Sequence, residues 1–364
     1  MLGLDGVRAL AVVLVVTIHA DHWPAQDAGA DLAVWGTVDR MARVAVPLFV
    51  ILTGFLLTYR RQAELPRRAF LRRRFGRSLL PWVVWLPVYS VIGLLLTAEV
   101  PHDWWGAAKW VLLGGGHLWY LILVPQLYLV FLFWPRSTRG LVVAAALALA
   151  VQVGLGAYRL YGPADAPLNG LFLASGFEFF VYWIGYFGVG AALGSVFAVG
   201  RPRWPAWPWW PAAGVGAILV VAIDVQRAPN GTFAQGTGAF LTPALPLLAL
   251  GVFVAVALGA DPVLRRHPRL RRAVETVSRY SLGVYIVHGA LLYLPGRLLS
   301  GELESHLPGS ALAFAVLGAA TLWLALAVTR LLAATPLAIT IGNEREDLPW
   351  WLPWPLTRPH RTAA

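Results

Sequence analysis

The sequence contains no cysteine and little charge. Because no thiol is present, a disulfide, a thiolate nucleophile and a cysteine-ligated zinc ion are all excluded. Charged residues make up 13% of the 364 residues, whereas a soluble domain carries about 25%. So few charges cannot cover a water-facing surface of this size. The chain is therefore predicted to be an all-α, polytopic integral membrane protein with the lipid bilayer as its main solvent.

The hydrophobic residues gather in runs of membrane-spanning length. They make up 58% of the chain and raise its mean hydropathy to +0.65, and a span needs about 20 residues. Gly114, Gly115 and Gly116 are expected to weaken the fourth run. A transmembrane domain of residues 1–336 would precede a loosely ordered, Pro-, Trp- and Arg-rich cytoplasmic tail of residues 337–364. The ten expected spans are residues 7–23, 44–59, 79–97, 110–134, 141–158, 174–198, 211–226, 238–259, 277–296 and 310–333.

The basic residues predict the orientation. The net charge of +11 comes mainly from arginines in short loops after the even-numbered runs, and cytoplasmic loops are the ones enriched in basic residues. Both termini are therefore expected in the cytoplasm, as a multi-pass protein of the plasma membrane. This placement explains the charge without a nucleic-acid partner, and none is expected. The bias towards arginine, with Lys109 as the one lysine, indicates a GC-rich bacterial genome.

Arg8 and His19 are ionisable residues within the first span. They are eleven residues apart, which is about three helical turns, so both side chains should share a face roughly 16 Å apart. Ionisable groups in a span are expected to be functional by default, and imidazole can take and return a proton near neutral pH. The alternative is that Arg8 anchors the topology and His19 reaches back to the interface.

An arginine-rich segment precedes the third span. Arg74 and Arg77 lie at i and i+3 on one helical face beside Arg73, and guanidinium forks suit phosphate oxygens. Positive-inside charge or contact with anionic lipid explains the same segment without a ligand, and on this pattern alone that explanation is favoured.

A polar and aromatic stripe begins at His117. Trp119, Tyr120, Gln126 and Tyr128 follow it, and this composition suits stacking on a sugar and hydrogen bonding to its hydroxyls. An aromatic belt at the membrane interface is the alternative.

Two later segments also place polar groups within apolar runs. Tyr285 and His288 share a face with Ser281, and such groups usually bond a neighbouring helix, so a structural role is favoured over catalysis here. Glu178 is either a buried acid or a group at the outer rim.

These segments together resemble the membrane-bound acyltransferase 3 family, the bacterial O-acyltransferases that modify surface glycans and related molecules. None of these motifs identifies the family alone. Their occurrence in this order, within a frame of ten helices, is specific for it. The resemblance rests on Leu4 to Leu10 followed by His19, Val46-Pro47-Leu48-Phe49 with Thr53-Gly54-Phe55-Leu56, Phe70 to Pro81, His117-Leu118-Trp119-Tyr120, Tyr186-Phe187 with Gly190, and Ser278 to His288.

The resemblance implies an enzyme that moves an acyl group from cytoplasmic acyl-CoA, with acetyl-CoA as the expected donor, to a hydroxyl of an outer-side glycan or small molecule. It implies that His19 is the catalytic residue, with Arg8 as its paired arginine, and that no metal takes part. Arg74, Arg77 and Arg73 would bind the donor. The substrate-binding candidates are His117, Trp119, Tyr120, Gln126, Tyr285, His288 and Glu178.

One segment departs from the family pattern. Many relatives carry consecutive glutamates after the His-Leu-Trp motif, where this chain has Val124-Pro125-Gln126, so an acidic role in that helix is in doubt. Thr53 also stands where serine is commoner.

Two mechanisms and two rival functions, a transporter and a receptor or structural membrane protein, stay open. His19 would act as a general base or as a transient acyl carrier, and the base is preferred because it needs no covalent intermediate. A transporter of a glycan or lipid-linked sugar would also place polar groups in a ten-helix bundle, although no inverted repeat is apparent. The sequence leaves the oligomeric state, the acceptor and the acyl chain length open.

Overall fold

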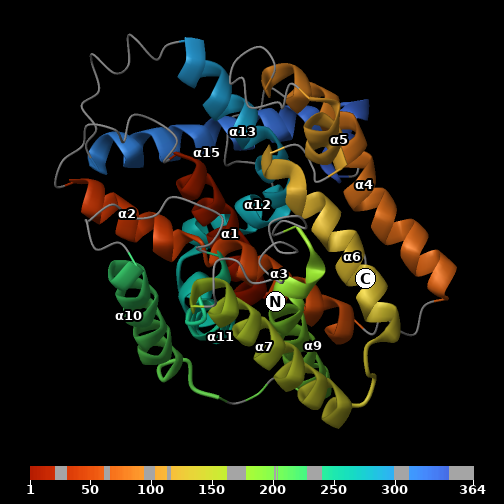
Figure 1. Cartoon of the computed structure of the whole chain (residues 1–364), viewed down its shortest axis with the longest axis vertical. Coiled ribbons are helices and arrows are strands. Elements are labelled where there is room, and N and C mark those ends of the chain that lie inside the picture. The colour runs from red at the N-terminus through yellow and green to blue at the C-terminus, as the bar shows by residue number, and fades with distance from the viewer. Residues whose placement is uncertain are drawn as a thin grey trace.

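The computed structural model describes residues 1–20, 31–60, 66–93, 103–112, 116–161, 178–200, 202, 204–227, 240–298 and 311–343, and every regular element within these ranges is a helix (Figure 1). The α-helices are α1 (Leu2–Ala20), α2 (Asp31–Ala42), α3 (Ala45–Tyr59), α4 (Arg67–Ile92), α5 (Trp104–Leu112), α6 (Tyr120–Phe133), α7 (Thr138–Tyr161), α9 (Ile184–Val199), α10 (Trp209–Arg227), α11 (Leu245–Arg266), α12 (Pro268–Arg279), α13 (Ser281–Leu298) and α15 (Ala311–Ala333). Three short 3-10 helices are η4 (Gly116–Trp119), η5 (Phe180–Tyr182) and η7 (Pro336–Ile341).

The surface of the bundle is apolar where a soluble protein would be polar. Val142, Leu147 and Val151 of α7 are 50%, 64% and 52% exposed, and lipid tails are the solvent that suits such a face. Within the described ranges, 6 helical segments are long and apolar enough to cross a membrane. They are α1, Gly36–Tyr59 across α2 and α3, α4, α7, α11 and α15. The protein is therefore a multi-pass, all-helical membrane protein.

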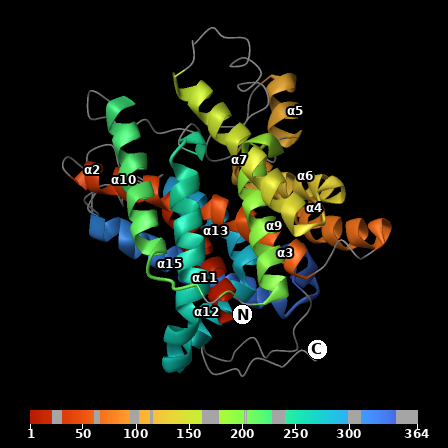
Figure 2. The ribbon, with the colours of Figure 1, turned by 90° about the horizontal axis from the view of Figure 1, so that it is seen from below.

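Helix α1 runs through the middle of the bundle, where α3, α11, α12, α13 and α15 all contact it (Figure 1). Around it, α10 lies alongside α11, and α7 alongside α9 (Figure 2). Small residues allow the close crossings. A Cβ atom at Gly54 of α3 would clash with the Phe187 carbonyl of α9, and one at Gly190 would clash with that of Ile51. These glycines thus bring the backbones of α3 and α9 into direct contact.

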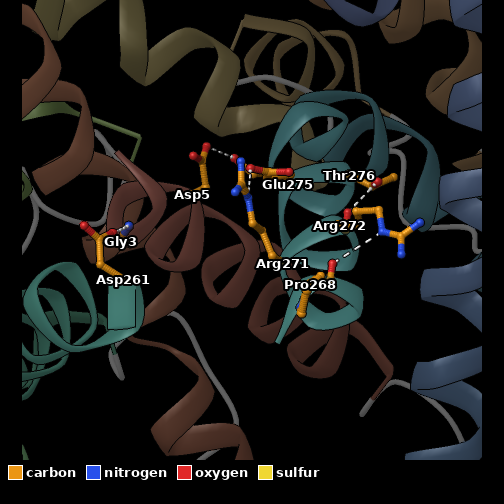
Figure 3. Close-up of polar contacts among 9 residues, drawn as sticks. Gly3, Asp5, Asp261, Pro268, Arg271, Arg272, Glu275 and Thr276 are labelled. Carbon is orange, nitrogen blue, oxygen red and sulfur yellow. Dashed lines mark hydrogen bonds and ion pairs between the residues drawn. The ribbon is translucent and has the colours of Figure 1, made fainter. Parts of the chain in front are cut away.

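The start of α1 is fixed to α11 and faces α12 (Figure 3). The Gly3 amide donates a hydrogen bond of 2.6 Å to Asp261 Oδ1 of α11. On α12, the Arg271 Nε atom lies 2.8 Å from Glu275 Oε1. The first turn of the central helix is therefore held by polar contacts, while its middle is packed in an apolar core.

Several boundaries differ from the expected spans. Helices α2, α5 and α12 are additional, α11 begins at Leu245 instead of 238 and continues to Arg266, and α9 begins only at Ile184. Polar residues in α2 and α12 hid these helices from a search for apolar runs. The first residues of the expected loose tail are ordered, since Ala338 and Ile341 of η7 are buried. The parts of the expected spans at 21–23, 94–97, 113–115, 174–177, 238–239 and 310, and the tail from 344 to 364, lie outside the described residues.

Candidate active site

His19 lies one residue before the end of α1 and is partly buried. Its Nδ1 atom is 2.9 Å from the Val15 carbonyl oxygen, one turn earlier in the same helix. Because a carbonyl oxygen only accepts, Nδ1 must carry the ring proton in this contact. The Nε2 atom of the neutral ring then keeps its lone pair, which is the form that can accept a proton from a hydroxyl group.

Three imidazole rings meet at this end of α1. The ring centroid of His19 lies 4.8 Å from that of His288 and 5.8 Å from that of His117, and the latter two are 5.0 Å apart. His288 comes from α13 and His117 from η4, and they are 0% and 5% exposed. Sequence analysis named all three residues but placed them in separate motifs. We call them the imidazole cluster, and its side of the bundle the His19 end.

Backbone carbonyls fix the other two rings of the cluster. His288 Nδ1 donates to the Val284 carbonyl at 3.1 Å, and His117 Nε2 donates to the Ile286 carbonyl at 3.4 Å. Within the described part of the chain, His288 Nε2 is buried and has no hydrogen-bond partner. Gly289 makes the approach of His117 possible, because a Cβ atom there would lie 2.6 Å from His117 Cε1.

Tyr89 of α4 is a residue of this site that sequence analysis missed. Its hydroxyl donates to the Ile286 carbonyl at 2.6 Å and accepts from the Ala290 amide at 2.8 Å. These two groups are the partners that an α-helix joins from i to i+4. The Tyr89 ring also lies 4.4 Å from that of His117. A hydroxyl within an apolar span needs a partner, and this is the signal that could have singled out Tyr89.

Two tyrosines connect the imidazole cluster to the middle of the bundle. The Tyr285 hydroxyl donates to the His117 carbonyl. Its ring lies 5.8 Å from that of Tyr120, which in turn lies 5.9 Å from Phe49. The stripe that starts at His117 therefore runs along α6 inside the bundle, where the interfacial-belt alternative would have left it outside.

Arg8 lies at the opposite end of the same face of α1. Its Nη1 atom is 3.5 Å from the Ser278 hydroxyl, which donates to Asp5 Oδ1 at 2.8 Å. Arg8 thus faces the end of α12, while His19 faces α13, the next helix in the chain. Both residues lie in one continuous helix, which is the condition for the expected common face. We call this side of the bundle, with the first turns of α1 and α12, the Arg8 end.

The arginine pair on α4 is divided between two environments. Arg74 is partly buried, and its Cζ atom lies 5.8 Å from the centroid of the Tyr128 ring on α6. Arg73 and Arg77 are exposed. Arg74 therefore contacts α6, while the side chains of Arg73 and Arg77 are exposed.

Trp119, Gln126 and Glu178 belong to a group beside the imidazole cluster. The Gln126 amide donates to the Glu178 carbonyl at 3.0 Å and accepts from the Phe180 amide at 3.2 Å. Trp119 stacks on Trp183 with a centroid distance of 5.4 Å. Gln126 therefore holds the start of η5 against α6 through backbone contacts.

Sequence analysis also missed a group of buried charges at the end of α2. Asp39 and Arg40 are 5% and 3% exposed, and Asp39 Oδ2 pairs with Arg43 Nε at 2.9 Å. In the sequence these residues stand between the first and second expected spans. The i to i+4 spacing of Asp39 and Arg43, directly before the apolar run from Val44, is the signal that pointed to a helix.

The arrangement suits proton transfer in an enclosed site. Three imidazole rings lie together, and each is oriented by a hydrogen bond to a backbone carbonyl. Over the part of the chain that is described, no group of three or more His, Asp or Glu side chains is arranged to hold a metal ion.

Comparison with known families matches residues 1–330 to the acyltransferase 3 family, described as an acyltransferase domain. No curated protein and no solved structure matches the chain. The matched range includes α1, the imidazole cluster and the arginines of α4. The family assumed from the motifs is thus confirmed over most of the sequence: the chain belongs to the acyltransferase 3 family and is an acyltransferase.

Proposed function

We propose that the protein moves an acetyl group from acetyl-CoA, reached from the cytoplasm, to a hydroxyl of a glycan or similar acceptor on the outer side of a bacterial plasma membrane. The observation that carries this proposal is the position of His19. Its Nδ1 atom is held by the Val15 carbonyl and its ring lies against His288 and His117. This geometry supports a role for Nε2 as the general base.

In the proposed step, Nε2 of His19 takes the proton from the acceptor hydroxyl as its oxygen attacks the thioester carbonyl. The carbon–oxygen bond forms, the carbon–sulfur bond breaks, and the thiolate of CoA leaves and takes the proton from the imidazolium. His117 and His288 pack against this ring. A transient acyl-imidazole is the alternative route.

The donor is proposed to bind at the Arg8 end. Arg74, with the exposed Arg73 and Arg77, would contact the phosphates of CoA, and Arg8 would follow deeper in the bundle. The rise of α1 from Arg8 to His19 is roughly 16 Å, so the narrow arm of the donor would have to extend along this helix. Tyr128, which contacts Arg74, and Tyr120, which contacts Tyr285, are the aromatic side chains proposed to line this path.

The test is His19→Gln and His19→Ala in purified protein, with acetyl-labelled acetyl-CoA and a bacterial membrane glycan fraction as acceptor. Transfer of label should fall by about 100-fold or more, the usual contribution of a general base. Asp103→Asn, at the exposed first turn of α5, is the matched control and should transfer like the wild type. Transfer near the wild-type level in either His19 variant would rule out this mechanism.

A second measurement separates the two chemical routes. Wild-type protein is mixed with labelled acetyl-CoA without acceptor, denatured within seconds and separated from small molecules. A general base predicts no label on the protein, whereas an acyl-imidazole route predicts label that His19→Gln abolishes. The transporter alternative would give movement of glycan across vesicles without transfer of label.

A further inference from the structure

A buried ion pair lies at the His19 end and has no part in the proposed chemistry. The side chains of Asp39 and Arg43 are 6% and 13% exposed, with Oδ2 and Nε 2.9 Å apart. Removing a charge from water costs several kcal/mol per ion, and a single buried pair seldom adds to stability. Folding stability therefore does not explain why an ion pair lies in this position.

The second carboxylate oxygen of Asp39 indicates that a ligand binds here. Oδ1 is buried, and no donor among the described residues lies within hydrogen-bond distance of it. A carboxylate is an acceptor-only group, and leaving a buried acceptor without a donor destabilises the fold. A hydroxyl group from a bound molecule would supply the donor that the described residues do not.

Aromatic rings continue from this ion pair. The Arg43 Cζ atom lies 5.1 Å from the centroid of the Phe240 ring. Phe240 is 5.8 Å from Trp183 and 6.2 Å from Trp119, measured between ring centroids. Trp119 and Phe240 are each 8% exposed. A carboxylate, a guanidinium and several aromatic faces together match the two sides of a sugar ring, which has polar hydroxyls at its edge and apolar C–H groups on its face.

This group is next to the imidazole cluster. Trp119 follows His117 by two residues within η4. Ala42 and Ala45, on either side of Arg43, pack in one buried cluster with Ile18 and Tyr285. An occupant of the group would therefore lie beside His19, and at the opposite end of α1 from Arg8 and Ser278.

We propose that Asp39, Arg43, Trp119 and Phe240 form the acceptor subsite, with Trp183 stacked behind Trp119, and that it takes a sugar ring. A ring hydroxyl donates to Asp39 Oδ1, Arg43 donates to a neighbouring oxygen of the sugar, and the aromatic rings contact its C–H face. A second hydroxyl of the same sugar is then presented to His19. This inference rests on the proposed function, and it assigns the acceptor to residues that the donor does not contact.

The first experiment measures transfer of labelled acetyl groups to two probes, methyl glucoside and glucuronate, by wild type and Asp39→Asn. We expect the KM for the accepted sugar to rise at least tenfold in Asp39→Asn. The KM for acetyl-CoA and the slow hydrolysis of acetyl-CoA by water should not change. Asp103→Asn serves as the control. Preference for glucuronate would indicate that the positive charges of Arg40 and Arg43 select an acidic sugar, and preference for methyl glucoside would indicate a neutral one.

Phe240→Leu is a second test variant that keeps the proposal testable if Asp39→Asn does not fold. It leaves the Asp39–Arg43 pair intact and removes only the aromatic face, so the KM for the sugar should rise about threefold or more with unchanged hydrolysis. The proposal is overturned if the wild type acetylates neither probe, or if both variants keep the wild-type KM for the sugar.

A binding measurement keeps this result separate from the proposed function. Ligands that bind only the folded state raise the melting temperature, so the accepted sugar should raise the melting temperature of the wild type and not that of Asp39→Asn. This shift is independent of catalysis. If it occurs while acetyl-CoA releases no CoA, the subsite stands and the proposed reaction fails. If acetyl-CoA is consumed but neither sugar shifts the wild type, the reaction stands and the subsite fails.

Discussion

The Arg8 end and the His19 end of α1 use polar residues in different ways. At the Arg8 end the arginines are numerous and largely exposed, and the Arg271–Glu275 pair is 48% and 27% exposed. At the His19 end, His117, His288 and Asp39 are buried, and backbone carbonyls orient the three imidazoles. Exposed charges interact weakly because water and salt screen them, whereas buried groups depend on exact placement.

The difference separates two tasks. Exposed guanidinium groups suit reversible binding of an anionic donor, since each contact is replaceable by water. Buried imidazoles suit proton transfer, since their geometry is fixed before substrate arrives. A substitution of the same chemical size should therefore have a large effect at the His19 end and a small one at the Arg8 end.

The largest effect is expected from adding a single methyl group. Gly289→Ala would place Cβ 2.6 Å from His117 Cε1, so the ring must move, and a displacement near 1 Å costs about 100-fold in rate. Gly76→Ala in α4 is the matched variant, because nothing lies within 4 Å of its Cβ position. It should keep full activity and gain about 0.5–1 kcal/mol in stability.

The measurement is the rate of acetyl transfer per folded molecule, together with the melting temperature of both variants in detergent. Equal activity in the two glycine variants would contradict the contrast between the ends of α1. A large loss in Gly76→Ala would contradict it as well.

A smaller effect is expected from Tyr89→Phe. This change keeps the ring against His117 but removes the hydroxyl that bonds the Ile286 carbonyl and the Ala290 amide. The His288 turn of α13 should then shift, and kcat should fall about tenfold, equivalent to roughly 1.4 kcal/mol.

The check is the separation of kcat from KM in steady-state kinetics with acetyl-CoA. If Tyr89 positions the imidazole cluster, kcat falls and the KM for acetyl-CoA stays constant. A loss that follows only the amount of folded protein, with kcat per folded molecule unchanged, would reduce Tyr89 to a structural residue. Tyr161→Phe, on the exposed end of α7, is the control for loss of a hydroxyl.

The smallest effect is expected at the Arg8 end from Ser278→Ala. The variant removes the hydroxyl between Arg8 and Asp5, a loss of about 1 kcal/mol. The KM for acetyl-CoA should rise about fivefold, because Arg8 becomes less well placed, and kcat should hardly change, since His19 is roughly 16 Å away. A fall in kcat larger than that of Tyr89→Phe would show that the two ends are not separable in this way.

Local patterns predicted the features that depend on one helix alone. The membrane environment followed from scarce charge and long apolar runs, and the common face of Arg8 and His19 followed from the helical repeat. The additional helices α2 and α12 were not predicted, because their charged residues contradict an apolar-run criterion. The burial of Asp39 was missed for the same reason, since a charge next to a span is normally at an interface.

Contacts between distant helices could not be predicted in the same way. Tyr89 and Ala290 are 201 residues apart in the chain, and nothing in either segment specifies the other. The approach of His117 depends on Gly289, whose missing side chain matters only once η4 is packed against α13.

By itself, the sequence determined that this chain is built for a bilayer and that its first helix carries an arginine and a histidine on one face, because hydropathy and the helical repeat are local properties. The tertiary structure alone decided that His19 meets His117 and His288, and that Asp39 is buried. Those contacts arise from side-chain packing among α1, α2, η4 and α13, and packing depends on the shapes of surfaces that are far apart in the sequence.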